Sequence, residues 1–362
     1  MLNPASTLLA ARGGSLSQRG RFVGGTLKAP QAAGFVKAVC SCMMVAMRLS
    51  LLLMFSGVLF AQKLVVLNKE DATLMIVDPK SGEVTGKTAT GEGPHEVEVS
   101  ADGRFAFVSN YGSRTPGSSL SVIDLRTAKE LHRVDLTPMQ RPHGLAMVDG
   151  KVWFTAEANK LVGRYDPATN RVDALLGTGQ TGTHMVMFSK DGRTMATANM
   201  GGDSISVWTL EGTNWNQTVV PVGKGPEGMD FTPDGLAIWT AHSRDGGVSI
   251  IDIATRKVSA SFDAGTKRSN RIKLTEDGKL ALISDLSGNE LVIVDVASRK
   301  VLKRVAIGKS PEGILIEPGG QRAYVAVTGQ NEIAVFDLKT LAVIRRIQTG
   351  KGPDGMAWVR LH

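Results

Sequence analysis

The sequence predicts an all-β fold: a seven-bladed β-propeller whose blades are four-stranded antiparallel sheets. The first observation is a unit of about 42 residues, clearest at 308–349, that recurs along the chain. Each unit holds four short runs rich in Val and Ile, separated by Gly, Asn and Asp, as is typical of strands and their turns. The second observation is that the turn after the first run recurs every 42 to 47 residues. These turns begin at Asp102, Asp149, Asp191, Asp234, Asp277 and Gly319.

The first 61 residues differ in composition from the rest of the chain. They contain six Lys and Arg and no Asp or Glu, so the formal net charge of +8 falls to +2 in the remainder. So small a net charge does not favour a protein that binds nucleic acid or a membrane surface through charge alone. Both cysteines, Cys40 and Cys42, also lie in this segment, so the remainder cannot form a disulfide.

Residues 47–61 have the layout of a secretory signal, with a basic start, a short apolar run and the small residue Ala61 before a polar segment. The apolar run is too short to span a bilayer comfortably. We therefore expect residues 1–61 to be an upstream extension plus a signal peptide. Residues 62–362 are then one propeller domain, periplasmic or secreted, with no membrane span after cleavage. A Ser- and Arg-rich organelle presequence is the alternative.

The two ends of this domain are expected to share one blade. Residues 353–359 resemble the first run of a unit but are followed by no further runs, whereas residues 64–90 hold three runs before the first complete unit. Six complete units and one shared unit make seven blades. Pairing of the N-terminal strands with the C-terminal strand closes the ring and leaves no open sheet edge between the termini.

The second runs carry a family resemblance. FVSN (107–110), MATAN (195–199) and AYVAV (323–327) each follow an Asp-Gly or Gly-Gly turn and precede a third run of the V-I-D-L type. In these segments the chain resembles the YVTN-type propeller family, whose repeat has about 40 residues. The resemblance implies the fold. It leaves the function open, because that superfamily includes binding proteins, lactonases and cofactor-carrying oxidoreductases.

One position in the first runs is polar or ionisable in every unit. It directly follows the proline or its equivalent and reads His95, His143, His184, Glu227, Asn270, Glu312 and Asp354. First strands line the axis of a propeller, so residues at the same phase are expected to form one layer around the central channel. Arg271 adds a cation one step further along its strand.

Two further sets of residues are expected on the same face, because first and second strands are antiparallel. The last residues of the second runs are Asn68, Asn110, Glu157, Asn199, His242, Asp285 and Val327. The loops that enter the first strands carry a basic collar of Arg141, Lys224, Lys267, Arg268, Lys309 and Lys351. The loop at 111–119 is four residues longer than its counterparts and is a candidate lid.

We interpret this polar face first as a ligand- or protein-binding module for a small anionic ligand, a peptide or another exported protein. Nucleic acid is disfavoured, because Trp153, Trp239 and Tyr324 lie inside second strands, where they are expected to pack between blades. The alternative is an enzyme, a lactonase-like hydrolase or lyase. In that case a histidine exchanges protons with Glu227 or Glu312 beside it, while Arg271 holds an anionic group.

The three histidines from consecutive blades also suggest a transition-metal site. His95, His143 and His184 would suit Zn or Cu, with Glu227 or a water completing the ligand set. Their nitrogens would have to converge at about 2.1 Å from one ion, and no HxH or HxxxH spacing enforces this. The competing interpretation is that these histidines hydrogen-bond to loop carbonyls of the next blade.

Overall fold

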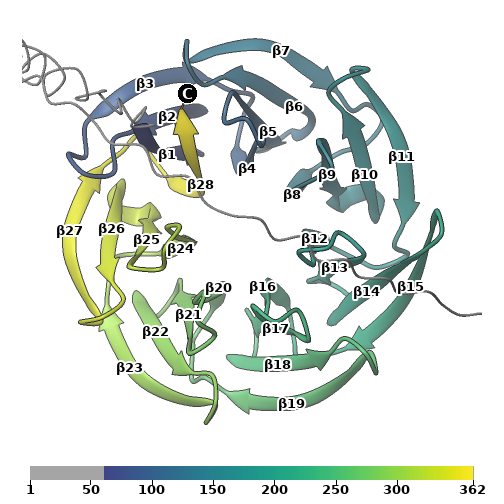
Figure 1. The fold of residues 1–362 in the computed structure, drawn as a ribbon, viewed down its shortest axis with the longest axis vertical. Coiled ribbons are helices and arrows are strands. Elements are labelled where there is room, and N and C mark those ends of the chain that lie inside the picture. The colour runs from purple at the N-terminus through teal and green to yellow at the C-terminus, as the bar shows by residue number, and fades with distance from the viewer. Residues whose placement is uncertain (1–60, 362) are drawn as a thin grey trace, which may run out of the picture. The chain divides into compact units, whose positions relative to one another are not determined.

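The computed structural model describes residues 61–361 and confirms the predicted fold. Seven four-stranded sheets stand around a central axis, and the first strand of each blade lies innermost (Figure 1). The blade shared by the two ends consists of β28 (Pro353–Leu361), β1 (Ala61–Asn68), β2 (Thr73–Val77) and β3 (Val84–Ala89), in that order.

The other six blades each come from one continuous segment. The next two contain β4 (Pro94–Val99), β5 (Phe105–Gly112), β6 (Pro116–Asp124) and β7 (Lys129–Asp135), then β8 (Pro142–Val148), β9 (Lys151–Ala156), β10 (Leu161–Asp166) and β11 (Arg171–Gly177). The following two contain β12 (Thr183–Phe188), β13 (Thr194–Asn199), β14 (Ser204–Glu211) and β15 (Asn214–Pro221), then β16 (Pro226–Phe231), β17 (Ala237–His242), β18 (Gly247–Asp252) and β19 (Lys257–Asp263). The last two contain β20 (Ser269–Leu274), β21 (Leu280–Asp285), β22 (Glu290–Asp295) and β23 (Lys300–Ala306), then β24 (Pro311–Ile316), β25 (Arg322–Val327), β26 (Glu332–Asp337) and β27 (Ala342–Gln348). Two single-turn 3₁₀ helices, η1 (Glu157–Asn159) and η2 (Thr328–Gln330), follow β9 and β25.

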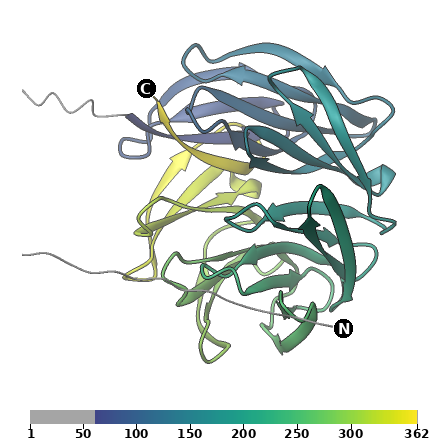
Figure 2. The same cartoon turned by 45° about the vertical axis from the view of Figure 1, so that its right-hand side comes forward.

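The ring closes as the sequence predicts. Strand β28 pairs antiparallel with β1, from Ala61 opposite Leu361 to Asn68 opposite Pro353. Both views place the yellow C-terminal strand against the purple N-terminal strands (Figure 1 and Figure 2). Since Val359 is buried in this pairing, the last strand contributes to the core as well as to the hydrogen-bonded ladder.

The core lies between the blades. Second and third strands are covered on both faces by neighbouring blades, so they are apolar at nearly every position, as in β25 and β26. The outermost strands face solvent on one side and alternate between exposed and half-buried residues, as in β11. The inner strands are therefore more uniformly apolar in sequence than the outermost ones.

Glycines let the innermost strands approach one another closely. Gly144, Gly228, Gly313 and Gly355 occupy the same phase, directly after the layer residue. A Cβ at Gly144 would lie 2.7 Å from the Cα of Met185, and one at Gly355 would lie 2.1 Å from the carbonyl oxygen of His95. Because a side chain does not fit there, these glycines set how tightly the layer residues gather around the axis.

The predicted extension and signal peptide at 1–61 lie almost entirely outside the described residues, so their assignment stays a prediction. Strand β1 begins at Ala61, one residue before the expected domain boundary. Within residues 61–361, no helix is long and apolar enough to cross a membrane.

Candidate functional site

All seven residues of the predicted first layer line one cavity of about 500 Å³, here called the histidine cavity. Each is the second residue of an innermost strand, so the strands deliver them to the same height. The layer residues in the cavity are His95, His143, His184, Glu227, Asn270, Glu312 and Asp354. The shared repeat position therefore correctly predicted that side chains up to 259 positions apart in the chain lie together.

The three histidines stack along one side of this cavity. The ring centroids of His143 and His184 are 3.6 Å apart, and those of His95 and His143 are 4.9 Å apart. Tyr111 lies over His95 at 4.7 Å between centroids and donates a hydrogen bond of 2.8 Å to Glu157. Among residues 61–361, no group of three or more His, Cys, Asp or Glu side chains is arranged to hold a metal ion. The Zn or Cu hypothesis stays a prediction.

The orientation of His95 is set by one backbone carbonyl. Its Nδ1 lies 2.8 Å from the carbonyl oxygen of Gly93, which can only accept, so Nδ1 carries the proton and Nε2 is the acceptor. Burial lowers the pKa of His95 to about 4; nearby Lys69 contributes to this, and Asp354 opposes it. The imidazole is therefore neutral near pH 7, with its free lone pair on Nε2. Burial likewise lowers the pKa of His143 well below the usual value.

A buried lysine sits between two acids on another side of the cavity. Lys69, directly after β1, forms ion pairs with Glu312 and, at 3.2 Å, with Asp354. Burial alone would lower the pKa of Lys69, but the two carboxylates together raise it above its ordinary value. Burial and the neighbouring Asp354 raise the pKa of Glu312 to about 7. Although burial opposes it, Lys69 and Arg271 hold the pKa of Asp354 below its ordinary value.

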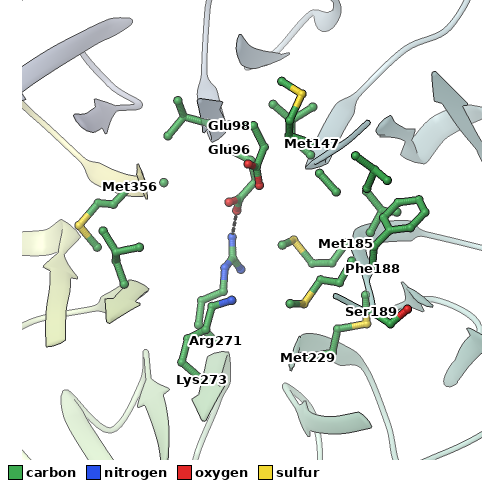
Figure 3. A pocket seen from close by; sticks show the side chains of 18 of the residues that line it. Glu96, Glu98, Met147, Met185, Phe188, Ser189, Met229, Arg271, Lys273 and Met356 are labelled. Carbon is green, nitrogen blue, oxygen red and sulfur yellow. Dashed lines mark hydrogen bonds and ion pairs between the residues drawn. The ribbon is translucent and has the colours of Figure 1, made fainter. Parts of the chain in front are cut away.

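Arg271 crosses the channel and pairs with Glu96 (Figure 3). It also donates a hydrogen bond of 3.4 Å to Asn270, which in turn donates one of 2.6 Å to Glu227. Burial opposes the charge on Arg271, but Glu96 and Asp354 raise its pKa further. Glu96 thus occupies the guanidinium of Arg271 in this structure, and the expectation that Arg271 holds an anionic group stays a prediction.

Several polar atoms of the cavity are buried without a hydrogen-bond partner in residues 61–361. They are Nδ1 of His143, Nδ1 and Nε2 of His184, Oε2 of Glu227 and Oδ1 of Asp354. Nδ1 of His184 lies 3.7 Å from Oε2 of Glu157, which is too far for a hydrogen bond. Leaving buried polar atoms unpaired costs about 1–3 kcal/mol each. A cluster of such atoms around one cavity is therefore suited to a polar ligand.

The second predicted layer does not form in the cavity, apart from Glu157. Strand ends lie further from the axis than the first strands, and their side chains tie each blade to its own turns. Asn110 accepts from the Gly91 amide, Asn199 donates to Ser204 and Ser206, Asp285 accepts from the Lys267 and Arg268 amides, and His242 bonds Asp245. Asn110, Asn199, His242 and Asp285 are thus placed as structural residues.

The basic collar reaches the cavity at one point. Arg268 lines it and forms no ion pair within the described chain. The guanidinium of Arg141 lies 4.6 Å from the ring centroid of Tyr111, and the Lys267 side chain is exposed. Lys224, Lys309 and Lys351 are also exposed. Within residues 61–361, Arg268 is therefore the one collar residue that offers an uncommitted cation to a molecule bound in the cavity.

Lys69, Glu96 and Tyr111 belong to the site but were missed by the sequence analysis. Lys69 directly follows the strand-end position in the shared blade, and Glu96 occupies the same repeat position as Arg271. Comparing repeat positions could therefore have predicted both residues. Tyr111 lies in the expected lid. There β5 extends to Gly112 and β6 begins at Pro116, so most of that segment is strand, and it contributes a ring to the site.

A family model described as "Lactonase, 7-bladed beta-propeller" matches residues 57–358 of the chain. No curated protein is significantly similar to it in sequence. Hence the family match covers all of the propeller except the last three residues of β28, without a curated relative that would narrow the substrate.

Solved structures share the fold at low sequence identity. A putative 6-phosphogluconolactonase from Bacteroides uniformis is 17% identical, covers 83% of this chain and 100% of its own, and has a TM-score of 0.70. The periplasmic gluconolactonase of Pseudomonas aeruginosa is 18% identical, with 83% and 99% coverage and a TM-score of 0.69. Hydrazine synthase of Kuenenia stuttgartiensis is 20% identical, with 73% and 88% coverage and a TM-score of 0.63. At such identities these similarities support the fold alone.

The family match changes the functional interpretation of the sequence. We preferred a binding module without catalysis, and this preference is wrong, because the matching family model is that of lactonases. The enzyme alternative, which uses the histidines and acids of the same cavity, is the better supported one.

Proposed function

The chain belongs to the seven-bladed β-propeller lactonase family, and we propose that it hydrolyses a lactone in the histidine cavity. The observation that carries the proposal is the pairing, in one cavity, of a histidine with a fixed tautomer and a lysine held by two acids. Opening a cyclic ester needs a base for the attacking water, a positive group for the carbonyl oxygen and an acid for the leaving alkoxide.

His95 is the proposed base. Its Nε2 accepts a proton from water as the water oxygen attacks the lactone carbonyl carbon. The imidazolium then returns this proton to the ring oxygen as the carbon–oxygen bond breaks, which gives the open hydroxy acid. A neutral imidazole in a fixed tautomer suits this cycle, since the backbone carbonyl of Gly93 holds Nδ1–H throughout.

Lys69 is the proposed electrophilic group. Its ammonium stays charged, because Glu312 and Asp354 raise its pKa, and they also fix its position. A preorganised cation in a buried site stabilises the negative charge that develops on the carbonyl oxygen. The unpartnered atoms of His143, His184 and Glu227 are then available for the hydroxyl groups of the substrate.

A sugar-acid lactone fits this cavity best among cyclic esters. Its hydroxyl groups match the unpaired imidazole and carboxylate atoms, whereas an unsubstituted aliphatic lactone would leave them unsatisfied. Arg268 would bind an anionic substituent such as a phosphate. The two solved lactonases of similar fold are described as acting on gluconolactone or its 6-phosphate, which agrees with this class of substrate.

Export completes the proposal. The layout of residues 47–61 is that of a signal peptide, and the P. aeruginosa relative is described as periplasmic. We therefore place the activity in the periplasm or outside the cell. Fractionation of cells that express the full-length chain would test this, and recovery of uncleaved protein from the cytoplasm would contradict it.

The activity is tested by following acid release from a panel of lactones with a pH indicator. The panel contains glucono-1,5-lactone, its 6-phosphate and an unsubstituted δ-lactone, each corrected for spontaneous hydrolysis. We expect turnover of the sugar-acid lactones and little of the unsubstituted one. If folded protein accelerates none of them, the proposal is wrong; if it favours the unsubstituted ring, the assigned roles of the polar atoms are wrong.

A further inference from the structure

A second cavity of about 550 Å³ has the Arg271–Glu96 pair in its lining (Figure 3). It is here called the methionine cavity. Arg271 lines both cavities, so this ion pair stands between them. The lining extends to Asp149 and Asp191, in the turns after the first strands. Those turns lie at the opposite ends of the strands from the histidine cavity.

The charges inside the methionine cavity leave one acid without a partner. Arg271 is paired with Glu96, and Nζ of Lys273 lies 3.7 Å from Asp230. Glu98 forms no ion pair and no side-chain hydrogen bond within residues 61–361. Arg271 and Lys273 are thus each matched by an acid, and Glu98 is left without a cation on the innermost strands. Lys190, Asp149 and Asp191 also line the cavity, but they lie in the turns at its edge. Burial raises the pKa of Glu98 to about 7, although Lys273 opposes this.

The wall of this cavity is apolar and adaptable. Its methionines are Met147, Met185, Met187, Met229 and Met356. They come from four different blades, and Phe188 lies beside them. Figure 3 shows Met185 and Met229 on one side of the cavity and Met356 on the other. Unbranched thioethers repack around ligands of different shape and make favourable contacts with aromatic rings.

We propose that the methionine cavity is a second binding site, for a singly charged organic cation with an apolar, preferably aromatic, body. Such a ligand places its ammonium group against Glu98 and its apolar part against the methionines. An anion would add a second uncompensated charge, and a neutral molecule would leave Glu98 unpaired. Asp149 and Asp191 at the edge add negative charge, while Lys190 is engaged with the Pro233 carbonyl.

This site is independent of the proposed lactonase activity. Its ligand class differs from an uncharged or anionic lactone, and the residues that would bind the ammonium and the apolar body are absent from the lining of the histidine cavity. A failure of lactone hydrolysis therefore leaves this inference standing, and the reverse also holds.

The test is calorimetric titration of the purified protein with three probes of similar shape and different charge. Benzylamine, benzyl alcohol and phenylacetate are compared at about pH 8, where Glu98 and the amine are both ionised. We expect benzylamine to bind at least about 10-fold more tightly than the other two. Glu98→Gln should reduce benzylamine affinity by about 10-fold and keep lactone hydrolysis. Glu276→Gln, at an exposed carboxylate outside the cavity, should change neither.

Three results would overturn the inference. They are equal affinity for benzylamine and benzyl alcohol, no saturable binding of benzylamine at millimolar concentration, and unchanged benzylamine affinity in Glu98→Gln. Should Glu98→Gln fold poorly, the comparison of the three probes on the unaltered protein still decides the question, because it varies the charge of the ligand instead of the charge of the site.

Discussion

His95 differs from the other histidines of the cavity in one respect: a backbone carbonyl holds its Nδ1. If it acts as the base, His95→Ala should lower kcat by about 10²- to 10⁴-fold with a smaller change in KM. His132→Ala is the matched control, because that histidine lies exposed on β7, away from both cavities. Initial rates with glucono-1,5-lactone measure both. Full activity in His95→Ala would remove this residue from the mechanism.

The pH profile of kcat/KM separates the two titrating groups of the histidine cavity. His95 has a pKa of about 4, so its imidazole becomes neutral, and activity rises, as the pH increases through that value. Glu312 has a pKa of about 7, and its ionisation adds a second anion that holds Lys69, so a smaller rise follows there. We expect two steps, the upper of which disappears in Glu312→Gln. A single step near pH 6.5, the ordinary imidazole value, would contradict these roles.

Proton binding to Glu98 should make the stability of the folded protein depend on pH. Its pKa is about 7 in the folded protein against 4.5 for an ordinary Glu, so the folded state retains a proton that the unfolded chain has lost. Stability from this group is therefore highest below about pH 4.5 and falls as the pH rises through 7. Relative to wild type, Glu98→Gln should gain about 1–2 kcal/mol in free energy of unfolding between these limits. Urea titrations at both pH values measure it, and a pH-independent difference would refute it.

The sequence predicted which residues share a height around the axis. For the first layer this was enough to place the side chains in the channel, but for the second layer it was not. The first layer was found because every propeller places its first strands innermost, so one repeat phase means one position. Asn110 and Asn199 share a phase too, yet their side chains bond to serines of their own blades. Partners such as Lys69 with Glu312, 243 residues apart, depend on side-chain lengths and directions that repeat spacing does not contain.

Among the strands, the innermost ones depend on glycine for their spacing. In Gly355→Ala, the new Cβ would meet the His95 carbonyl oxygen at 2.1 Å, so β28 and β4 must separate. We expect a loss of about 1–3 kcal/mol in stability and a lower kcat, because His95 moves with its strand. Gly177→Ala is the control, since nothing lies within 4 Å of its added Cβ. Equal unfolding midpoints for the two variants would show that the strands are not in the contact described.

The strands could be predicted from the sequence because burial leaves a pattern of apolar residues. Inner strands are buried on both faces, and outer strands are buried on one. The segment at 111–119 was wrongly expected to be a loop, because Gly and Ser favour loops; its role as a lid stays a prediction. There the ladder continues, with Gly112 opposite Pro116, so hydrogen bonding between strands overrode local propensity.

The fold of the whole molecule depends on closure of the ring of blades, which the count of repeat units predicted. Six complete units and two partial ones fit a closed ring in only one way, with the C-terminal strand beside the N-terminal ones, and the pairing of β28 with β1 confirms it. Which side chains line the two cavities was less predictable, since each lining combines residues from all seven blades.

Removal of β28 tests this closure directly. A chain that ends at Gly352 leaves β1 as an open edge and uncovers the apolar residues that Val359 packs against in β1 and β2. The truncation removes a whole strand and its buried side chains, and a domain is stable by only about 5–15 kcal/mol, so we expect no cooperative thermal transition. A control chain that lacks only His362 should unfold as wild type does. A synthetic peptide of residues 353–361 should restore the transition if the strand acts by pairing with β1. Cooperative unfolding of the truncated chain at the wild-type midpoint would mean that the ring does not need its last strand.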